Sequence, residues 1–105
     1  MAITKTIIVD KTEVVSFGST YSSDEWKNVQ VRTATIIKED GVELNRSFHR
    51  HVLNPGTVAA GATALTDTNI SSEDAGVQAI CNAVWTSSVK EAYRAHLVGI
   101  RSSSL

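Results

Sequence analysis

The first half of the chain carries the pattern of β-strands. Ile3 to Val9 and Glu13 to Phe17 are rich in β-branched residues, which fit a pleated and half-buried surface. Trp26 to Lys38 and Glu43 to Leu53 continue this pattern with partial alternation of apolar and polar positions. The pattern predicts two short N-terminal strands, joined by a turn at Asp10-Lys11, and a hairpin over residues 26–53.

An Asp-Gly pair at positions 40–41 separates the two long strands, which is the strongest short-range signal for a hairpin. Both residue types tolerate the positive φ that a type I′ turn requires. A two-residue loop fixes the register, so Lys38 is expected opposite Glu43, and Ile37 opposite Leu44. The first of these is an opposite-charge pair across the strands.

This register separates two faces of the predicted hairpin. The face expected to cover the core carries Val29, Val31, Ile37, Leu44, Phe48 and Val52. The opposite face carries Gln30, Arg32, Lys38, Glu43, Asn45, His49 and His51. Arg46 and Arg50 fall on the core side, where we expect them to reach the sheet edges or to meet a partner.

A helical period follows the strands. Asn54-Pro55-Gly56 ends the hairpin, and residues 57–70, rich in Ala, Gly and Thr, are predicted to form a flexible connector or arm that a neighbouring subunit orders. Ser71 or Ser72 is expected to cap a first helix, and Trp85 to Ser88 to separate it from a second that frays from Gly99. The apolar stripes of the two helices are Val77, Ile80, Cys81 and Val84, then Val89, Tyr93, His96, Leu97 and Ile100. The sequence therefore predicts a single α+β domain over residues 1–105, an antiparallel sheet followed by two C-terminal helices.

Composition narrows the functional classes. The chain has 105 residues with a formal net charge of -1, so it lacks the overall basic field of a nucleic-acid-binding or membrane-surface protein. It has one cysteine, Cys81, and cannot form an internal disulfide, which suits a reducing cytoplasm. No signal peptide or transmembrane segment is evident. We expect a small domain with a thin core that gains stability from other subunits.

Enzymatic chemistry has no support in the motifs. No serine lies in a G-x-S-x-G elbow, and the glycines at 56 and 61 are not followed by the Gly-Lys-Ser/Thr of a phosphate loop. The acidic pairs coincide with predicted turns and helix starts, and no cofactor site is evident. We predict a protein that is not an enzyme and takes no small-molecule substrate.

His49 and His51 form the most suggestive spacing for a metal. Residues two apart on a strand point to one face, so two imidazoles could chelate one ion, and three such pairs could do so in a three-fold assembly. The alternative is a solvated sheet face that carries two histidines, which strand periodicity explains unaided. Zinc-finger spacing is lacking, so no metal site is predicted beyond these two weak candidates.

Five residues are candidates for a subunit interface. Trp26, Trp85 and Tyr93 are aromatic residues of the kind enriched in protein contacts, and Arg46 and Arg50 are the misplaced charges of the hairpin. The alternative for both tryptophans is that they fill the core.

Two stretches carry a family resemblance, residues 47–56 (SFHRHVLNPG) and 74–86 (DAGVQAICNAVWT). With residues 29–33 and 37–41, they resemble small, largely uncharacterised structural proteins encoded among the virion and tail-region genes of tailed bacteriophages, especially aquatic ones. The resemblance implies a virion component of a tail, fibre or head surface. It also implies assembly as a homo-oligomer with other virion proteins, after synthesis in the host bacterial cytoplasm. It supplies no catalytic residues.

Two alternatives from other classes stay open. Strands followed by two helices also resemble the element order of coat proteins of small RNA phages. In that class the sheet face binds RNA, and Arg32, Lys38, Arg46 and Arg50 would serve that role here, although the balanced charge is unfavourable. The second alternative is a small phage-encoded module that binds a host protein.

Overall fold

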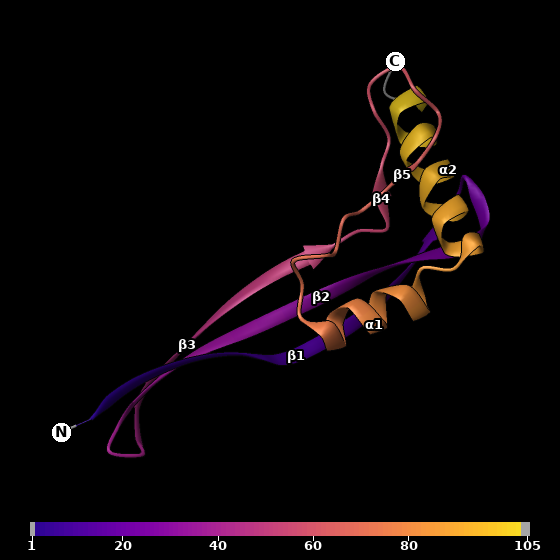
Figure 1. The fold of residues 1–105 in the computed structure, drawn as a ribbon. Helices are drawn as coiled ribbons and strands as arrows, with labels where there is room; N and C mark the ends of the chain where they lie inside the picture. The colour runs from indigo at the N-terminus through magenta and orange to yellow at the C-terminus, as the bar shows by residue number, and fades with distance from the viewer. Residues whose placement is uncertain (1, 104–105) are drawn as a thin grey trace.

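A computed structural model describes residues 2–103 of the chain as three long strands, a small second hairpin and two helices (Figure 1). The elements are β1 (Ile3–Ser19), β2 (Ser22–Glu39), β3 (Val42–Leu53), β4 (Gly56–Thr57), β5 (Thr66–Asp67), α1 (Ala75–Val84) and α2 (Ser87–Ser103). The long strands form one antiparallel sheet in the order β1-β2-β3, and β4 pairs with β5. The predicted α+β class, an antiparallel sheet followed by two helices, is confirmed.

The hairpin turn is the one that the sequence predicted. Asp40 and Gly41 both have positive φ, 51° and 83°, and join β2 to β3. The Asp40 carboxylate also accepts a hydrogen bond of 2.9 Å from the Ala2 amide, and the Asp40 amide donates one of 2.9 Å to the Ala2 carbonyl. The start of β1 is thereby fastened to the turn, and all three strands end together at one tip.

The predicted register beyond the turn is wrong by one residue. Lys38 does face Glu43, but a bulge follows, and Ile37 faces Asn45 with Leu44 as the extra residue. Because side chains alternate across a strand, this single insertion moves every later residue of β3 to the other face. Phe48, Val52 and the two arginines thus leave the predicted core side.

The two predicted N-terminal strands are a single strand. The expected turn at Asp10-Lys11 is a bulge, because Val9 pairs with Thr33 and Lys11 pairs with Arg32. Asp10 is the extra residue, and its carboxylate accepts two hydrogen bonds from the guanidinium of Arg32, of 3.0 and 2.9 Å. The Asp10–Arg32 pair joins β1 to β2 at the bulge, and β1 continues along β2 on both sides of it instead of turning back.

Helices α1 and α2 cover only one end of the sheet. Val29 and Val31 of β2, Val77 and Cys81 of α1, and Trp85 after α1 belong to one buried cluster. The Cys81 side chain is fully buried, and burial raises the pKa of its thiol above the usual value. The main buried cluster therefore lies beneath the helices, and Ala34 and Ile36 of β2 are buried outside it.

The helix ends differ from the predicted ones. Asp74, not Ser71 or Ser72, caps α1, since its side chain accepts the Gly76 amide at 2.9 Å. Helix α2 continues through Gly99 to Ser103. The ring of Tyr21 lies against the backbone of Gly99, so this glycine provides a close contact between the β1–β2 turn and α2.

The connector at 57–70 doubles back beside α2 (Figure 1). β4 and β5 pair across its base, and the Thr68 hydroxyl donates a hydrogen bond of 2.6 Å to the Asn54 carbonyl. Arg94 donates to the Thr63 carbonyl at 3.1 Å, and Arg101 to the Ala62 carbonyl at 2.6 Å. The segment is thus drawn onto the helix and does not project as an arm.

The molecule is markedly elongated. Its principal extents are 60 × 28 × 22 Å, and its radius of gyration is 18.0 Å, against about 13 Å for a compact chain of this length. The long axis matches β2, whose 18 residues span about 60 Å at 3.3 Å per residue. Among residues 2–103 no helix is long and apolar enough to cross a membrane.

Replacing Gly99 with Ala is expected to destabilise the protein. The new methyl group would overlap the ring of Tyr21, and overpacking of this kind costs about 1–3 kcal/mol, which outweighs the gain in helix propensity. Urea unfolding gives the change. Gly18→Ala is the control, because nothing lies within 4 Å of its added carbon. A Gly99→Ala protein as stable as the wild type would contradict this packing.

The two tryptophans offer a matched pair of substitutions. The Trp85 indole donates a hydrogen bond of 3.2 Å to the Lys27 carbonyl, whereas the buried Trp26 indole N–H has no acceptor among residues 2–103. Trp85→Phe should therefore cost about 1–3 kcal/mol more than Trp26→Phe, as measured by urea unfolding. Equal losses would mean that the Lys27 contact contributes nothing.

Candidate interaction surface

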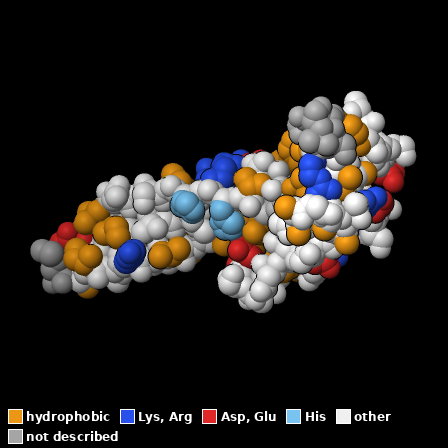
Figure 2. All heavy atoms as spheres, turned by 90° about the horizontal axis from the view of Figure 1, so that it is seen from above, with side chains coloured by type: hydrophobic (Ala, Val, Ile, Leu, Met, Phe, Trp, Pro, Cys, Tyr) orange, Lys and Arg blue, Asp and Glu red, His pale blue; other side chains and the backbone are white. Residues whose placement is uncertain are grey.

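The half of the sheet beyond the helices has no helix over it, although Ala34 and Ile36 of β2 in this half are 0% and 6% exposed, on the face of Arg32. We call it the outer sheet: residues 3–9 of β1, 33–39 of β2 and 42–49 of β3. Figure 2 shows it as the narrow end of the molecule, with hydrophobic side chains at its surface. Its exposed large apolar residues are Ile3, Ile7, Ile8, Val42, Leu44, Phe48 and, just beyond it, Val52. A monomer rarely exposes so many large apolar groups together unless the surface binds something.

Ion pairs crowd one face of the sheet near its middle, and we call it the ion-pair face. Its charged residues are Asp10, Lys11, Glu13, Arg32, Glu43, Arg46 and Arg50. Arg46 and Glu43 form a bidentate pair at 2.7 and 3.2 Å. Arg50 lies 3.6 Å from Glu13, which also contacts Lys11 at 2.8 Å. The bulges at Asp10 and Leu44 bring these groups to one side.

Arg32 is the centre of the ion-pair face. It holds Asp10 through two hydrogen bonds, and its guanidinium carbon lies 4.4 Å from the centroid of the Phe48 ring, in cation–π range. The hydrogen bond from Arg32 holds the pKa of Asp10 below its usual value. The arginine covers one face of the Phe48 ring, and with it in place Phe48 is still 54% exposed.

The opposite face, which we call the helix face, bears α1 at its inner end, whereas Trp26, on the face of Arg32, packs against Tyr93 of α2. The register places Ile3, Lys5, Ile7 and Val9 of β1, Thr33, Thr35, Ile37 and Glu39 of β2, and Val42, Asn45, Ser47 and His49 of β3 on the outer part of this face. Only Lys5 and Glu39 in this set are charged. The helix face thus extends the core surface past the end of α1 as a strip with few charges.

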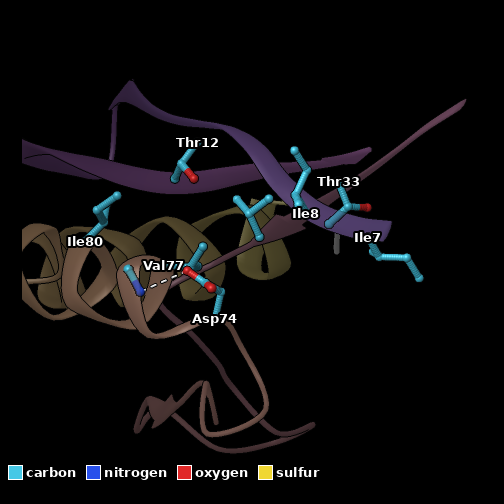
Figure 3. A pocket seen from close by; sticks show the side chains of 9 residues that line it. Ile7, Ile8, Thr12, Thr33, Asp74, Val77 and Ile80 are labelled. Carbon is cyan, nitrogen blue, oxygen red and sulfur yellow. Dashed lines mark hydrogen bonds between the residues drawn. The ribbon is translucent and has the colours of Figure 1, made fainter. Parts of the chain in front are cut away.

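A hollow of about 580 Å³ lies where this strip meets α1 (Figure 3). Ile7, Val9 and Thr33 line it from the sheet, and Val77 and Ile80 line it from the helix. Asp74 stands at its rim, where its side chain already caps the helix. The hollow is open and mainly apolar, so it suits an apolar side chain better than a charged ligand.

The structure places the five predicted interface residues in two groups. Trp26, Trp85 and Tyr93 are each at most 8% exposed and lie in the core. Trp26 stacks on Phe17 at 4.3 Å and packs against Tyr93 at 4.7 Å between ring centroids, which joins the sheet to α2. In the single chain the two tryptophans therefore match the alternative of core packing, and Tyr93 lies with them. Arg46 and Arg50 are exposed on the ion-pair face.

His49 and His51 lie on the same face of β3, with ring centroids 6.4 Å apart. The Nε2 atom of His51 is 2.8 Å from a carboxylate oxygen of Glu73, just before α1, so this imidazole tethers the strand to the helix end. Within residues 2–103 no three potential ligands converge on one point. One chain therefore brings two imidazoles together and no more, and metal binding by them stays a prediction.

The exposure of the outer sheet could not be predicted from its residues. Ile3, Ile7 and Phe48 look like core residues of a strand, and exposure depends on where the helices end. A signal was available in the lengths of the elements. α1 has 10 residues and α2 has 17, which at 1.5 Å per residue gives about 15 and 25 Å of helix. β2 has 18 residues, which at 3.3 Å per residue span about 60 Å.

Acid should loosen the ion-pair face. The pKa values of Asp10, Glu13 and Glu43 are lowered by their cationic partners. The stability they contribute is thus present above their unfolded values and lost as the pH falls through the lower folded values. We expect the melting temperature to fall below about pH 4, and less steeply in Asp10→Asn than in the wild type. Parallel curves for the two proteins would refute a role for Asp10.

A scan against protein-family models, a search of curated proteins and a search of solved structures each returned no match to this chain.

Proposed function

We propose that this protein is a structural component of a bacteriophage particle and works by assembly with further copies of itself and with other virion proteins. One observation carries the assembly part: the outer sheet projects beyond the helices with apolar side chains exposed on both faces. The resemblance to proteins from the virion genes of tailed phages supplies the particle. Its place would then be the virion, after synthesis in the host cytoplasm.

The exposed area favours assembly over a lone monomer. A compact protein of this mass exposes about 5,700 Å², whereas this chain exposes 6472 Å². The difference, roughly 750 Å², is close to the ~800 Å² that each partner buries in a standard interface. A chain that displays this much extra surface gains stability when another protein covers it.

The distribution of charge argues for protein contacts and against the RNA-binding sheet of the alternative. Arg32, Arg46 and Arg50 lie together on one face, as that alternative requires. Each of them, however, is already within 4 Å of a carboxylate, and the chain has a net charge of -1. RNA phosphates would have to displace these carboxylates, so little counterion release remains to favour binding.

The test has two measurements. Quantitative mass spectrometry of purified phage particles should find the protein in a fixed number of copies per particle. Light scattering of the purified protein should give a defined oligomer, and the mass should be compared with and without a chelator to test His49 and His51. A protein missing from particles would contradict the virion proposal. Salt-sensitive binding of RNA hairpins would instead favour the coat-protein alternative.

A further inference from the structure

We infer that the helix face of the outer sheet is the contact between two copies of this chain, packed face to face about a two-fold axis. This inference rests on the proposed assembly function and specifies which surface is used and what covers it. The partner is a second copy, whose own outer sheet lies across the first with the two tips pointing in opposite directions.

The helix face of the outer sheet is continuous with the surface of the core. On the helix face of β2, Val29 and Val31 are at most 1% exposed because α1 covers them. Thr33, Thr35 and Ile37 continue the same face of the strand toward the tip, and Thr33 borders α1 in the hollow beside Val77. The strands extend past the helices toward this tip (Figure 1). On β1, the flanking Ile3 and Ile7 are 56% and 63% exposed. The strip is an unfinished part of the core surface.

The two faces of the sheet differ in charge. Every ion pair recorded for residues 3–50 of the long strands, apart from the Lys27–Glu25 pair near the opposite end, lies on the ion-pair face. These pairs satisfy their own charges and suit contact with water. The helix face beyond α1 has mostly hydroxyl and aliphatic side chains, which are cheap to remove from water. The ion-pair face also exposes Ile8 and Phe48, but there they lie among paired charges, so a dry sheet-on-sheet contact is favoured on the helix face.

The edges of the sheet are less suited to the contact. β1 and β3 are both edge strands, and each carries a bulge, at Asp10 and at Leu44. A bulge bends the strand and interrupts its row of hydrogen-bonding groups, which blocks long edge-to-edge pairing. Contact through a face requires no free backbone groups and leaves these bulges undisturbed.

Area and shape fit a second copy. The whole chain exposes roughly 750 Å² more than a compact protein of its mass, an excess of the size that one partner buries in a standard interface, and packed sheets lie about 10 Å apart. With the copies antiparallel, the tip of each sheet reaches the start of α1 in the other. There the apolar hollow beside Val77 and Ile80 faces the tip residues Ile3 and Val42, which are 56% and 64% exposed. One surface thus supplies both the apolar tip and the apolar hollow that a two-fold contact needs.

Two matched pairs of substitutions test the face. Ile7→Lys and Ile3→Lys place a charge on the helix face, while Thr6→Lys and Thr4→Lys place the same charge on the other face at the adjacent positions. All four side chains are exposed in the single chain, so the fold should be kept, which circular dichroism and melting temperature will check. Analytical ultracentrifugation over a range of concentrations then gives the dissociation constant of the dimer.

We expect Ile7→Lys and Ile3→Lys to raise the dissociation constant by on the order of 100-fold or more, because a two-fold contact contains each substitution twice. Thr6→Lys and Thr4→Lys should stay within a few-fold of the wild type. A wild-type oligomer that all four variants leave unchanged would overturn this inference while assembly itself stands. A wild-type protein that remains monomeric at every concentration would overturn the inference and, separately, the self-assembly part of the proposed function.

Discussion

The buried contact of β2 with the two helices, through Val29 and Val31 and through Trp26 against Tyr93, is the interaction on which the rest of the structure depends. It is the place where the long sheet has a cover, and it positions α1 and, through Trp85, α2. Everything toward the tip holds together by strand pairing, by the fastening of Ala2 to Asp40 and by the Asp10–Arg32 pair. Two short helices cannot shelter a sheet of this length, so the chain consists of a packed end and a projecting end.

Much of the fold is readable from the residues. The Asp-Gly turn, the β-branched runs and the two apolar stripes predict the long hairpin and both helices, because each depends on local preferences that the structure keeps. The register could not be predicted. A one-residue bulge such as the one at Leu44 costs little free energy, and whether it forms depends on the side-chain contacts that the shifted strand makes. This bulge moves Arg46 and Arg50 to the face of Arg32 and Asp10. The two arginines stranded on the predicted core side were the sign that the simple register was wrong.

The candidate surface was harder to predict than the fold. Trp26, Trp85 and Tyr93 have the composition of an interface, but the same large rings are the best filler for a thin core, and that is where they lie. Conversely, Ile3, Ile7 and Phe48 look like core residues and lie at the surface. Residue type gives a tendency to be buried, whereas actual burial depends on which elements reach a given stretch of sheet. That reach is a property of the whole fold and not of any window of sequence.

For the proposed role in a phage particle, the position of Cys81 has a chemical consequence. A virion is built inside a reducing cell and then spends an indefinite time in oxygenated water, where accessible thiols form disulfides or are oxidised irreversibly. The only thiol of this chain lies on the buried side of α1, and burial, which raises its pKa, favours the unreactive protonated form. Copies packed at high density in such a particle would therefore neither form disulfides with one another nor lose their thiols to oxidation. The same protein is chemically suited to both environments without any change of state.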